Sequence, residues 1–213
     1  MINMINKLKI LFIIITAIIF SLAGCQQAVK NSMKTGTWSD DGRVFTNEWS
    51  NLCVTIPEGY RSLSPEEIQE VAGFGEDIMV NNGGMSKQSY NFSKMRTVYD
   101  FIITTETGIP NYILMYENIA LQSIIGNLDE EGYLNEVEKT LQKIDVLTYT
   151  NIGTSIKKLA GDDWLVGTFS LADGAAYQDY YLKKTGKIMI VFVVTYTDTE
   201  IVDTFIGAIT KAK

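Results

Sequence analysis

The amino-acid sequence predicts an α+β domain in which an antiparallel sheet is flanked by helices. Four successive segments in its last third alternate apolar and polar residues with a period of two: residues 147–159, 164–171, 175–184 and 187–196. Because turns of only two to four residues separate them, these segments are expected to pair as antiparallel neighbours in a meander. The helical patterns are few and do not alternate regularly with the strands, which argues against a parallel βαβ sheet.

The last strand of the meander is expected inside the sheet. Residues 188–194 are almost all apolar, as in strands that are covered on both faces. The lysine pairs Lys157-Lys158 and Lys183-Lys184 are typical of solvated strand edges, where charge discourages aggregation.

Shorter strands are predicted in the first half of the chain. Asp40-Asp41-Gly42 is a turn signal between residues 37–38 and 43–45, which predicts a hairpin. Residues 52–56 alternate up to Pro57 and predict the next strand. Two further strands are expected over 97–105 and 111–117.

Three helices complete the predicted domain. The first begins at Ser64, whose side chain can cap the helix while Glu67 returns a bond to the cap, and it ends near Ala72, before Gly73. The others are predicted over 130–143 and 198–211, where apolar residues recur at helical spacing. From Gly73 to Ser93 the pattern weakens, and the sequence indicates a long excursion whose order it does not specify.

The N-terminus has the pattern of a bacterial lipoprotein precursor. Lys7 and Lys9 precede residues 10–23, which are apolar except for two hydroxyl residues. As a helix this run is about 21 Å long, short of the roughly 30 Å hydrocarbon core, so a signal peptide fits better than a transmembrane span. Leu22-Ala23-Gly24-Cys25 resembles the lipobox, in which the cysteine receives a diacylglyceryl group and the chain is cut before it. The alternative is a plain secretory peptide followed by an incidental cysteine.

The predicted precursor therefore has three parts. Residues 1–24 are the signal peptide, residues 25–36 are the lipidated N-terminus and tether, and residues 37–213 are the α+β domain. Loss of residues 1–24 removes two lysines and no acid, so the formal charge changes from −7 to −9, a balance that argues against nucleic-acid binding.

The composition excludes several chemistries. The chain has no histidine, so neither a Ser-His-Asp triad nor a His-ligated zinc site can form within it. With Cys25 acylated, Cys53 has no partner for an intramolecular disulfide and is expected to be a packed free thiol. Neither a calcium-loop pattern nor a phosphate-binding loop is present, and we expect no metal and no cofactor.

Two kinds of candidate site remain. Tyr177, Asp179 and Tyr181 share one face of a predicted strand, where they could bind a sugar, a peptide or a partner protein. The alternative is aromatic packing beneath a helix, with Asp179 bonded to a tyrosine hydroxyl. Acidic clusters could support acid–base chemistry, although turns and a helix start also explain them. These clusters are Asp40-Asp41, Asp129-Glu130-Glu131 and Asp162-Asp163.

Several segments together resemble surface lipoproteins with a PsbP-like (Mog-like) domain. The similar segments are residues 44–49, residues 52–60 and the capped helix at Ser64, followed by the final meander and helix. Tyr60 stands where tryptophan is more usual in that family. The resemblance implies an α/β/α sandwich with mainly noncatalytic relatives, and it brings no site motif onto this chain.

These observations favour a noncatalytic module that is lipid-anchored at the extracytoplasmic face of the cell membrane. We expect it to contact the membrane through its acyl chains and to bind an envelope protein or component through one sheet face or residues 73–93. The alternatives are a carboxylate-dependent envelope hydrolase, recognisable by two buried acids about 5 to 9.5 Å apart, and a small-ligand capture protein with an apolar pocket.

Overall fold

The structure of the protein is a computed structural model, which describes residues 33–81, 85–120, 128–144 and 148–212. The predicted signal peptide, Cys25 and residues 26–32 of the predicted tether lie outside the described residues. No helix within the described ranges is long and apolar enough to cross a membrane.

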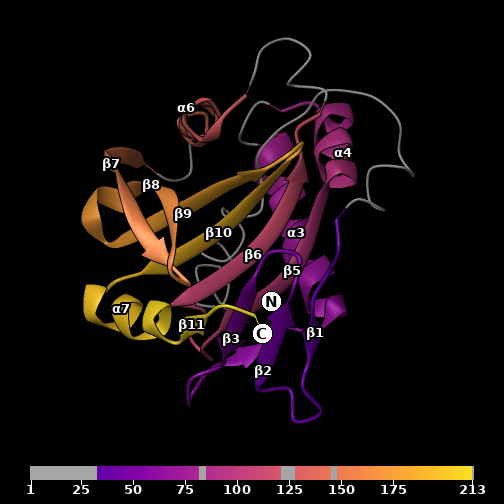
Figure 1. Ribbon diagram of the computed structural model, residues 1–213. Helices are drawn as coiled ribbons and strands as arrows, with labels where there is room; N and C mark the ends of the chain where they lie inside the picture. The colour runs from indigo at the N-terminus through magenta and orange to yellow at the C-terminus, as the bar shows by residue number, and fades with distance from the viewer. Residues whose placement is uncertain (1–32, 82–84, 121–127, 145–147, 213) are drawn as a thin grey trace.

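The domain is built on a seven-stranded sheet in which every pairing is antiparallel (Figure 1). Its order is β4 (Arg61–Ser62), β5 (Thr97–Thr104), β6 (Asn111–Asn118), β10 (Ile188–Tyr196), β9 (Ala176–Thr185), β8 (Asp162–Leu171) and β7 (Tyr149–Leu159). The predicted meander from β7 to β10 is confirmed. All nine residues of β10 are buried, as expected for a strand covered on both faces.

A second, four-stranded antiparallel sheet has the order β1 (Thr37–Trp38), β2 (Val44–Asn47), β3 (Leu52–Thr55) and β11 (Ile209–Thr210). The predicted hairpin forms β1 and β2. Strand β11 lies where the sequence predicts the end of a C-terminal helix. That helix, α7 (Thr199–Gly207), stops earlier, and the chain then pairs with β3.

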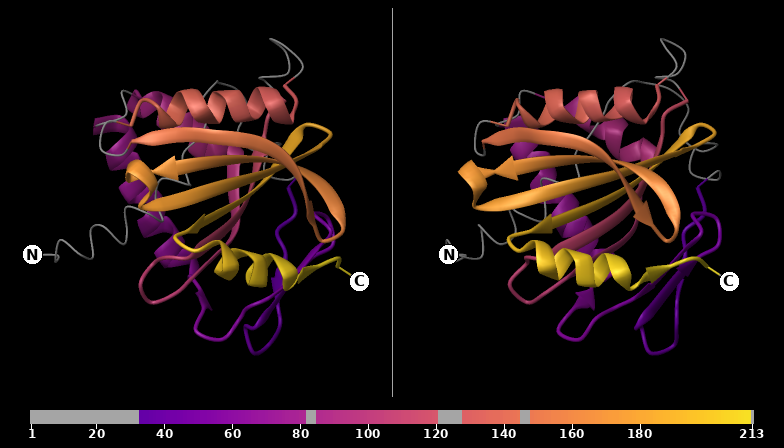
Figure 2. Two further views of the ribbon diagram at one scale, coloured as in Figure 1. Left: turned by 90° about the vertical axis from the view of Figure 1, so that its left-hand side faces the viewer. Right: turned by 60° about the vertical axis from the view of Figure 1, so that its left-hand side comes forward.

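Two hydrophobic cores cover opposite faces of the large sheet. On one face it packs against α3 (Pro65–Asn81), α4 (Lys87–Arg96) and α6 (Glu130–Leu141). On the other it packs against α7 and the small sheet, as Figure 2 shows. Alternation along β6 sends Ile113 and Met115 to the helical face and Leu114 and Tyr116 to the other. The α+β prediction with an antiparallel sheet flanked by helices is therefore confirmed, with a small second sheet beside α7.

The prediction that the first helix ends near Ala72 is wrong. Helix α3 continues through Gly73 to Asn81, and α4 follows after residues 82–84, which lie outside the described ranges. The helix continues because Ile78 and Met79 in its second half pack into the core. That burial outweighs the cost of a helical glycine, about 1 kcal/mol.

The beginning of the domain also differs from expectation. Met33, placed in the predicted tether, is only 5% exposed and packs into the core beside the small sheet. The backbone carbonyl of Lys34 accepts a hydrogen bond from Asn47 Nδ2 at 2.8 Å. A Cβ on Gly36 would lie 2.6 Å from the carbonyl oxygen of Thr46, so the chain passes too close to β2 for any side chain there. Residues 33–36 are therefore docked on the domain, and we call them the docked segment.

Candidate functional site

The predicted Tyr177–Asp179–Tyr181 face lies on β9 and points toward α7 and the small sheet. Tyr181 belongs to the same core as Phe205 of α7, and Asp179 is only 1% exposed. Tyr177 is half-buried and stacks on Tyr196, with 5.7 Å between ring centroids. The three side chains share a face as predicted, but two of them are enclosed. A binding role for this face stays a prediction.

Asp179 is held by three donors. Lys157 Nζ reaches from β7 across β8 to donate to Asp179 Oδ2 at 2.7 Å. Thr168 Oγ1 donates to the other carboxylate oxygen at 2.8 Å, and the Tyr196 hydroxyl donates to that same oxygen at 3.2 Å. The bond from a tyrosine hydroxyl is the one that the packing alternative predicts. Charge and hydrogen bonds are thus satisfied within the protein.

A second buried carboxylate, Glu117, lies on the opposite face of the sheet. Arg96 Nη2 donates to Glu117 Oε1 at 2.9 Å, and the hydroxyl of Tyr133 from α6 donates to Glu117 Oε2 at 2.7 Å. Burial raises the pKa of Glu117 to about 7, and it outweighs the opposing attraction of Arg96 and the Tyr133 bond. Glu117 was not among the predicted site residues. The signal was present, because Glu117 continues the alternation of Ile113 and Met115, which face the helical core.

A third acid, Asp100, fastens the docked segment to the large sheet. It lies at an irregularity in the pairing of β5 with β6, where the register shifts between Tyr99 and Phe101. Asp100 Oδ1 accepts from the backbone N–H of Gly36 at 2.8 Å, and Oδ2 accepts from Asn47 Nδ2 at 2.7 Å and from the Tyr116 hydroxyl. Burial raises the pKa of Asp100, and these hydrogen bonds oppose the shift.

The three acids do not form the pair that a glycosidase needs. Glu117 is on the helical face, whereas the bonds of Asp100 and Asp179 are to residues on the other face. Asp100 on β5 and Asp179 on β9 are three strand positions apart, which corresponds to about 14 Å. That separation exceeds the roughly 5 to 9.5 Å of catalytic carboxylates in glycosidases. The described residues also contain no group of three His, Cys, Asp or Glu side chains that could hold a metal ion.

The predicted acidic clusters have structural partners. Asp41 accepts from the backbone N–H of Arg43 at 3.0 Å in the β1–β2 turn, and Asp129 caps α6 through the N–H of Gly132 at 2.8 Å. Asp162 begins β8 instead of lying in a turn, and it binds Lys183 Nζ at 2.6 Å and Lys211 Nζ at 2.8 Å. Hydrogen bonds from these two lysines lower the pKa of Asp162 to about 2.

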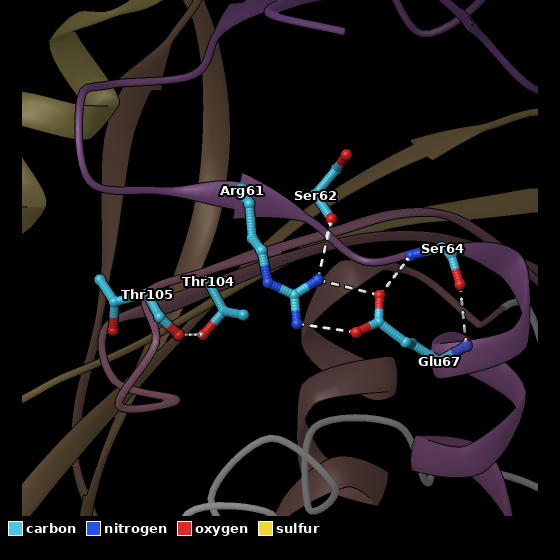
Figure 3. Close-up of polar contacts among 6 residues, drawn as sticks. All are labelled: Arg61, Ser62, Ser64, Glu67, Thr104 and Thr105. Atoms are coloured by element: carbon cyan, nitrogen blue, oxygen red, sulfur yellow. Dashed lines mark hydrogen bonds and ion pairs between the residues drawn. The ribbon is translucent and has the colours of Figure 1, made fainter.

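The predicted cap of α3 is confirmed and extended by an arginine, as Figure 3 shows. Glu67 N donates to Ser64 Oγ at 3.2 Å, and Ser64 N donates to Glu67 Oε2 at 2.8 Å. Arg61 from β4 donates to both carboxylate oxygens of Glu67, at 2.9 and 2.7 Å, and lowers the pKa of that carboxyl. The cluster is exposed, and the charges of Arg61 and Glu67 pair with each other, so a structural role accounts for it.

The outer edge of β7 is open and exposed in the described domain. Strand β7 ends the seven-stranded sheet, and no described strand pairs with its outer side. Nine consecutive residues, 150–158, are exposed, which means that both faces of the strand are accessible. Ile152 is 55% exposed and Ile156 is 62% exposed. The lysine pair Lys157-Lys158 correctly indicated an edge strand. The pair Lys183-Lys184 did not, because it lies on β9, which pairs with both β10 and β8. Sequence alternation did not predict exposure on both faces of β7.

Among known proteins, the chain has matches to solved structures but not to family models or curated proteins. Among solved structures, the chain is similar to the cyanobacterial PsbP protein (CyanoP) of Synechocystis sp. PCC 6803, with 8% identity, a TM-score of 0.44, and coverage of 89% of this chain and 98% of that one. A protein of Bacteroides thetaiotaomicron VPI-5482 matches with 8% identity, a TM-score of 0.37, and coverage of 80% of this chain and 48% of that one. Similarity at this level carries no argument about function, and the fold class rests on the strands and helices themselves.

Proposed function

We propose that this protein is a lipid-anchored module at the extracytoplasmic face of the cell membrane, which binds an extended segment of an envelope protein along the open edge of β7. The open edge carries this proposal. An unpaired strand presents a row of backbone N–H and C=O groups, and an added strand satisfies them while side-chain contacts give specificity. Ile152 and Ile156 would supply those contacts, since burying one such side chain fully gains about 1.5 to 3 kcal/mol.

The docked segment supports the membrane-tethered part of the proposal. Met33 is eight positions after Cys25, so a fully extended chain between them spans about 27 Å. An anchor at Cys25 would therefore hold the domain near the bilayer, with its point of attachment set by the bonds of Asn47 and Asp100 to the docked segment. Two or more acyl chains on Cys25 would give stable anchoring.

The anchor is tested by substituting Cys25, with the other cysteine of the chain as the control. In cells labelled with palmitate, we expect Cys25→Ala to abolish labelling and to leave the chain at full precursor size. Cys53→Ala, which changes a half-buried thiol in β3, should leave labelling and processing unchanged. Equal labelling and processing in the two variants would refute the anchor.

The binding edge is tested by a photo-crosslinking amino acid at Thr154 in the middle of β7. We expect the full-length protein in cell envelopes to form a discrete adduct with a polypeptide. Ile156→Lys should abolish the adduct, because a charge would have to be buried in the strand pair. Ile201→Lys changes an isoleucine on α7 that is also exposed, at 38%, and should leave the adduct intact. Loss of the adduct in both variants, or in neither, would refute binding through β7.

A further inference from the structure

We propose that the strand which pairs with β7 is β7 of a second copy of this chain, antiparallel to it, with a two-fold axis at Thr154. This inference rests on the proposed function, since it identifies the partner of the same edge. It makes the protein a homodimer in which two seven-stranded sheets join along their open edges.

The strand is centred on the proposed axis. Thr154 is the middle residue of the eleven that form β7, so a two-fold axis there pairs the strand with its copy over its whole length. In this register each Ile152 lies opposite the partner copy's residue 156, and Gly153 lies opposite residue 155. Pairs of β-branched residues opposite one another stabilise antiparallel strands. The dimer would therefore contain two such pairs, each between Ile152 of one copy and Ile156 of the other.

Charge favours the same register. With the axis at Thr154, Lys157 lies opposite the copy's residue 151 and Lys158 opposite its residue 150, which are asparagine and threonine. An axis between the two lysines would instead set like charges against each other, which is destabilising. Residues 149–159 contain no acid, and both lysines already have carboxylate partners, Asp179 and Asp163. The edge is nearly neutral, although the chain as a whole is acidic.

The irregularity in β7 is compatible with this pairing. Ile152 is the extra residue where the register with β8 shifts between Asn151 and Gly153. A bulge increases the local twist of a strand. In a two-fold pair both copies carry the bulge at the same distance from the axis, and the three residues 153–155 between the two bulges keep a regular register with β8.

The register is tested by disulfide trapping in the full-length, membrane-bound chain, in a Cys53→Ser background. Opposite residues in an antiparallel pair have Cα atoms about 4.5 to 5.5 Å apart, which a disulfide can span. Thr154→Cys should therefore form a covalent dimer on mild oxidation. Thr150→Cys is the matched control, because in this register the two copies of residue 150 are eight positions apart, about 27 Å. Thr150→Cys should form a dimer only when it is co-expressed with a Lys158→Cys copy.

Each outcome decides between the two proposals. A dimer from Thr154→Cys but not from Thr150→Cys alone, and lost with Ile156→Lys, supports the homodimer. Equal trapping at both positions, or none at Thr154, overturns it. If Thr154→Cys gives no dimer while the photo-crosslinker at Thr154 still captures a different polypeptide in an Ile156-dependent manner, the second copy is excluded and the binding edge stands. Failure of both probes refutes both proposals.

Discussion

Glu117 gives the domain a pH-dependent stability that its composition does not suggest. The chain has no histidine, the side chain that ordinarily titrates between pH 5 and 8. Burial places Glu117 in this window by raising its pKa from 4.5 to about 7. Asp162 and Glu67 have lowered pKa values, so their effects on stability appear at more acidic pH.

The sign and size of the effect follow from proton linkage. Because the pKa of Glu117 is higher in the folded than in the unfolded chain, the folded protein binds more protons between about pH 4.5 and 7. The free energy of unfolding therefore falls as the pH rises through this window. The rise in pKa corresponds to a loss of about 3 kcal/mol. Asp100, whose pKa is also raised by burial, contributes with the same sign.

The test compares Glu117→Gln with the wild-type chain by urea unfolding at pH 5, 6, 7 and 8, at constant ionic strength. Glutamine retains the shape of the neutral acid and an acceptor for Tyr133, but it cannot titrate. We expect the variant to match the wild type near pH 5, to lose most of the pH slope, and to be more stable by about 3 kcal/mol at pH 8. Glu136→Gln, on the exposed side of α6, should leave the slope unchanged. A variant less stable than the wild type by about 3 to 5 kcal/mol at pH 8 would refute the reasoning, because it would show that the ion pair with Arg96 outweighs desolvation.

Two further pairs of substitutions, one of glycines and one of adjacent lysines, are predicted to differ in their effect on stability. Gly36→Ala should destabilise the domain by about 1 to 3 kcal/mol in urea unfolding, because the new Cβ would overlap β2. Gly73→Ala in α3 should stabilise the domain by about 1 kcal/mol, because the new Cβ meets no atom within 4 Å and alanine favours the helix. Equal effects would contradict the docked path of residues 33–36. Lys157→Ala should lower stability by about 2 kcal/mol, because it leaves Asp179 buried without a cation. In the same assay Lys158→Ala should cost less than about 0.5 kcal/mol, because it removes only the exposed ion pair with Asp163. A similar loss in both lysine variants would show that the bond to Asp179 is not the cause.

The C-terminal meander was predictable because its connections are local. Ala160 and Gly161 both have positive φ, 50° and 77°, as in the two-residue turns that join antiparallel strands. Once that turn forms, Leu159 lies opposite Asp162, and the alternation of the strand fixes the rest of the register.

Elements whose stability depends on distant contacts were not predictable. Gly73 is a helix-stop signal in sequence terms, but α3 continues because Ile78 and Met79 meet the core. Strand β11 is only two residues long, and it exists because Ile209 pairs with Val54, more than 150 positions earlier. A local pattern contains no information about such a partner.

The candidate-site residues also divide into features that local patterns predict and features that depend on distant contacts. The common face of Tyr177, Asp179 and Tyr181 follows from alternation alone, but its enclosure depends on where α7 packs. No sequence pattern marked Asp100 as a buried acid, because its inward position arises at an irregularity of β5. Its hydrogen-bond partners come from the docked segment and from β2. Burial of these acids is a tertiary property.

The docked segment and the open edge are far enough apart for the proposed anchoring and the proposed strand pairing to proceed together. Asp100 fastens the docked segment to β5, whereas β7 is five strand positions away in the same sheet, a distance of about 24 Å. If residues 33–36 were free, the proposed tether would be longer, and the orientation of the sheet to the proposed bilayer would vary. With these residues docked, the chain enters the domain near β5, so its entry point does not occupy the edge of β7. The proposed anchor at one end of the sheet would therefore leave the other end open to a second strand.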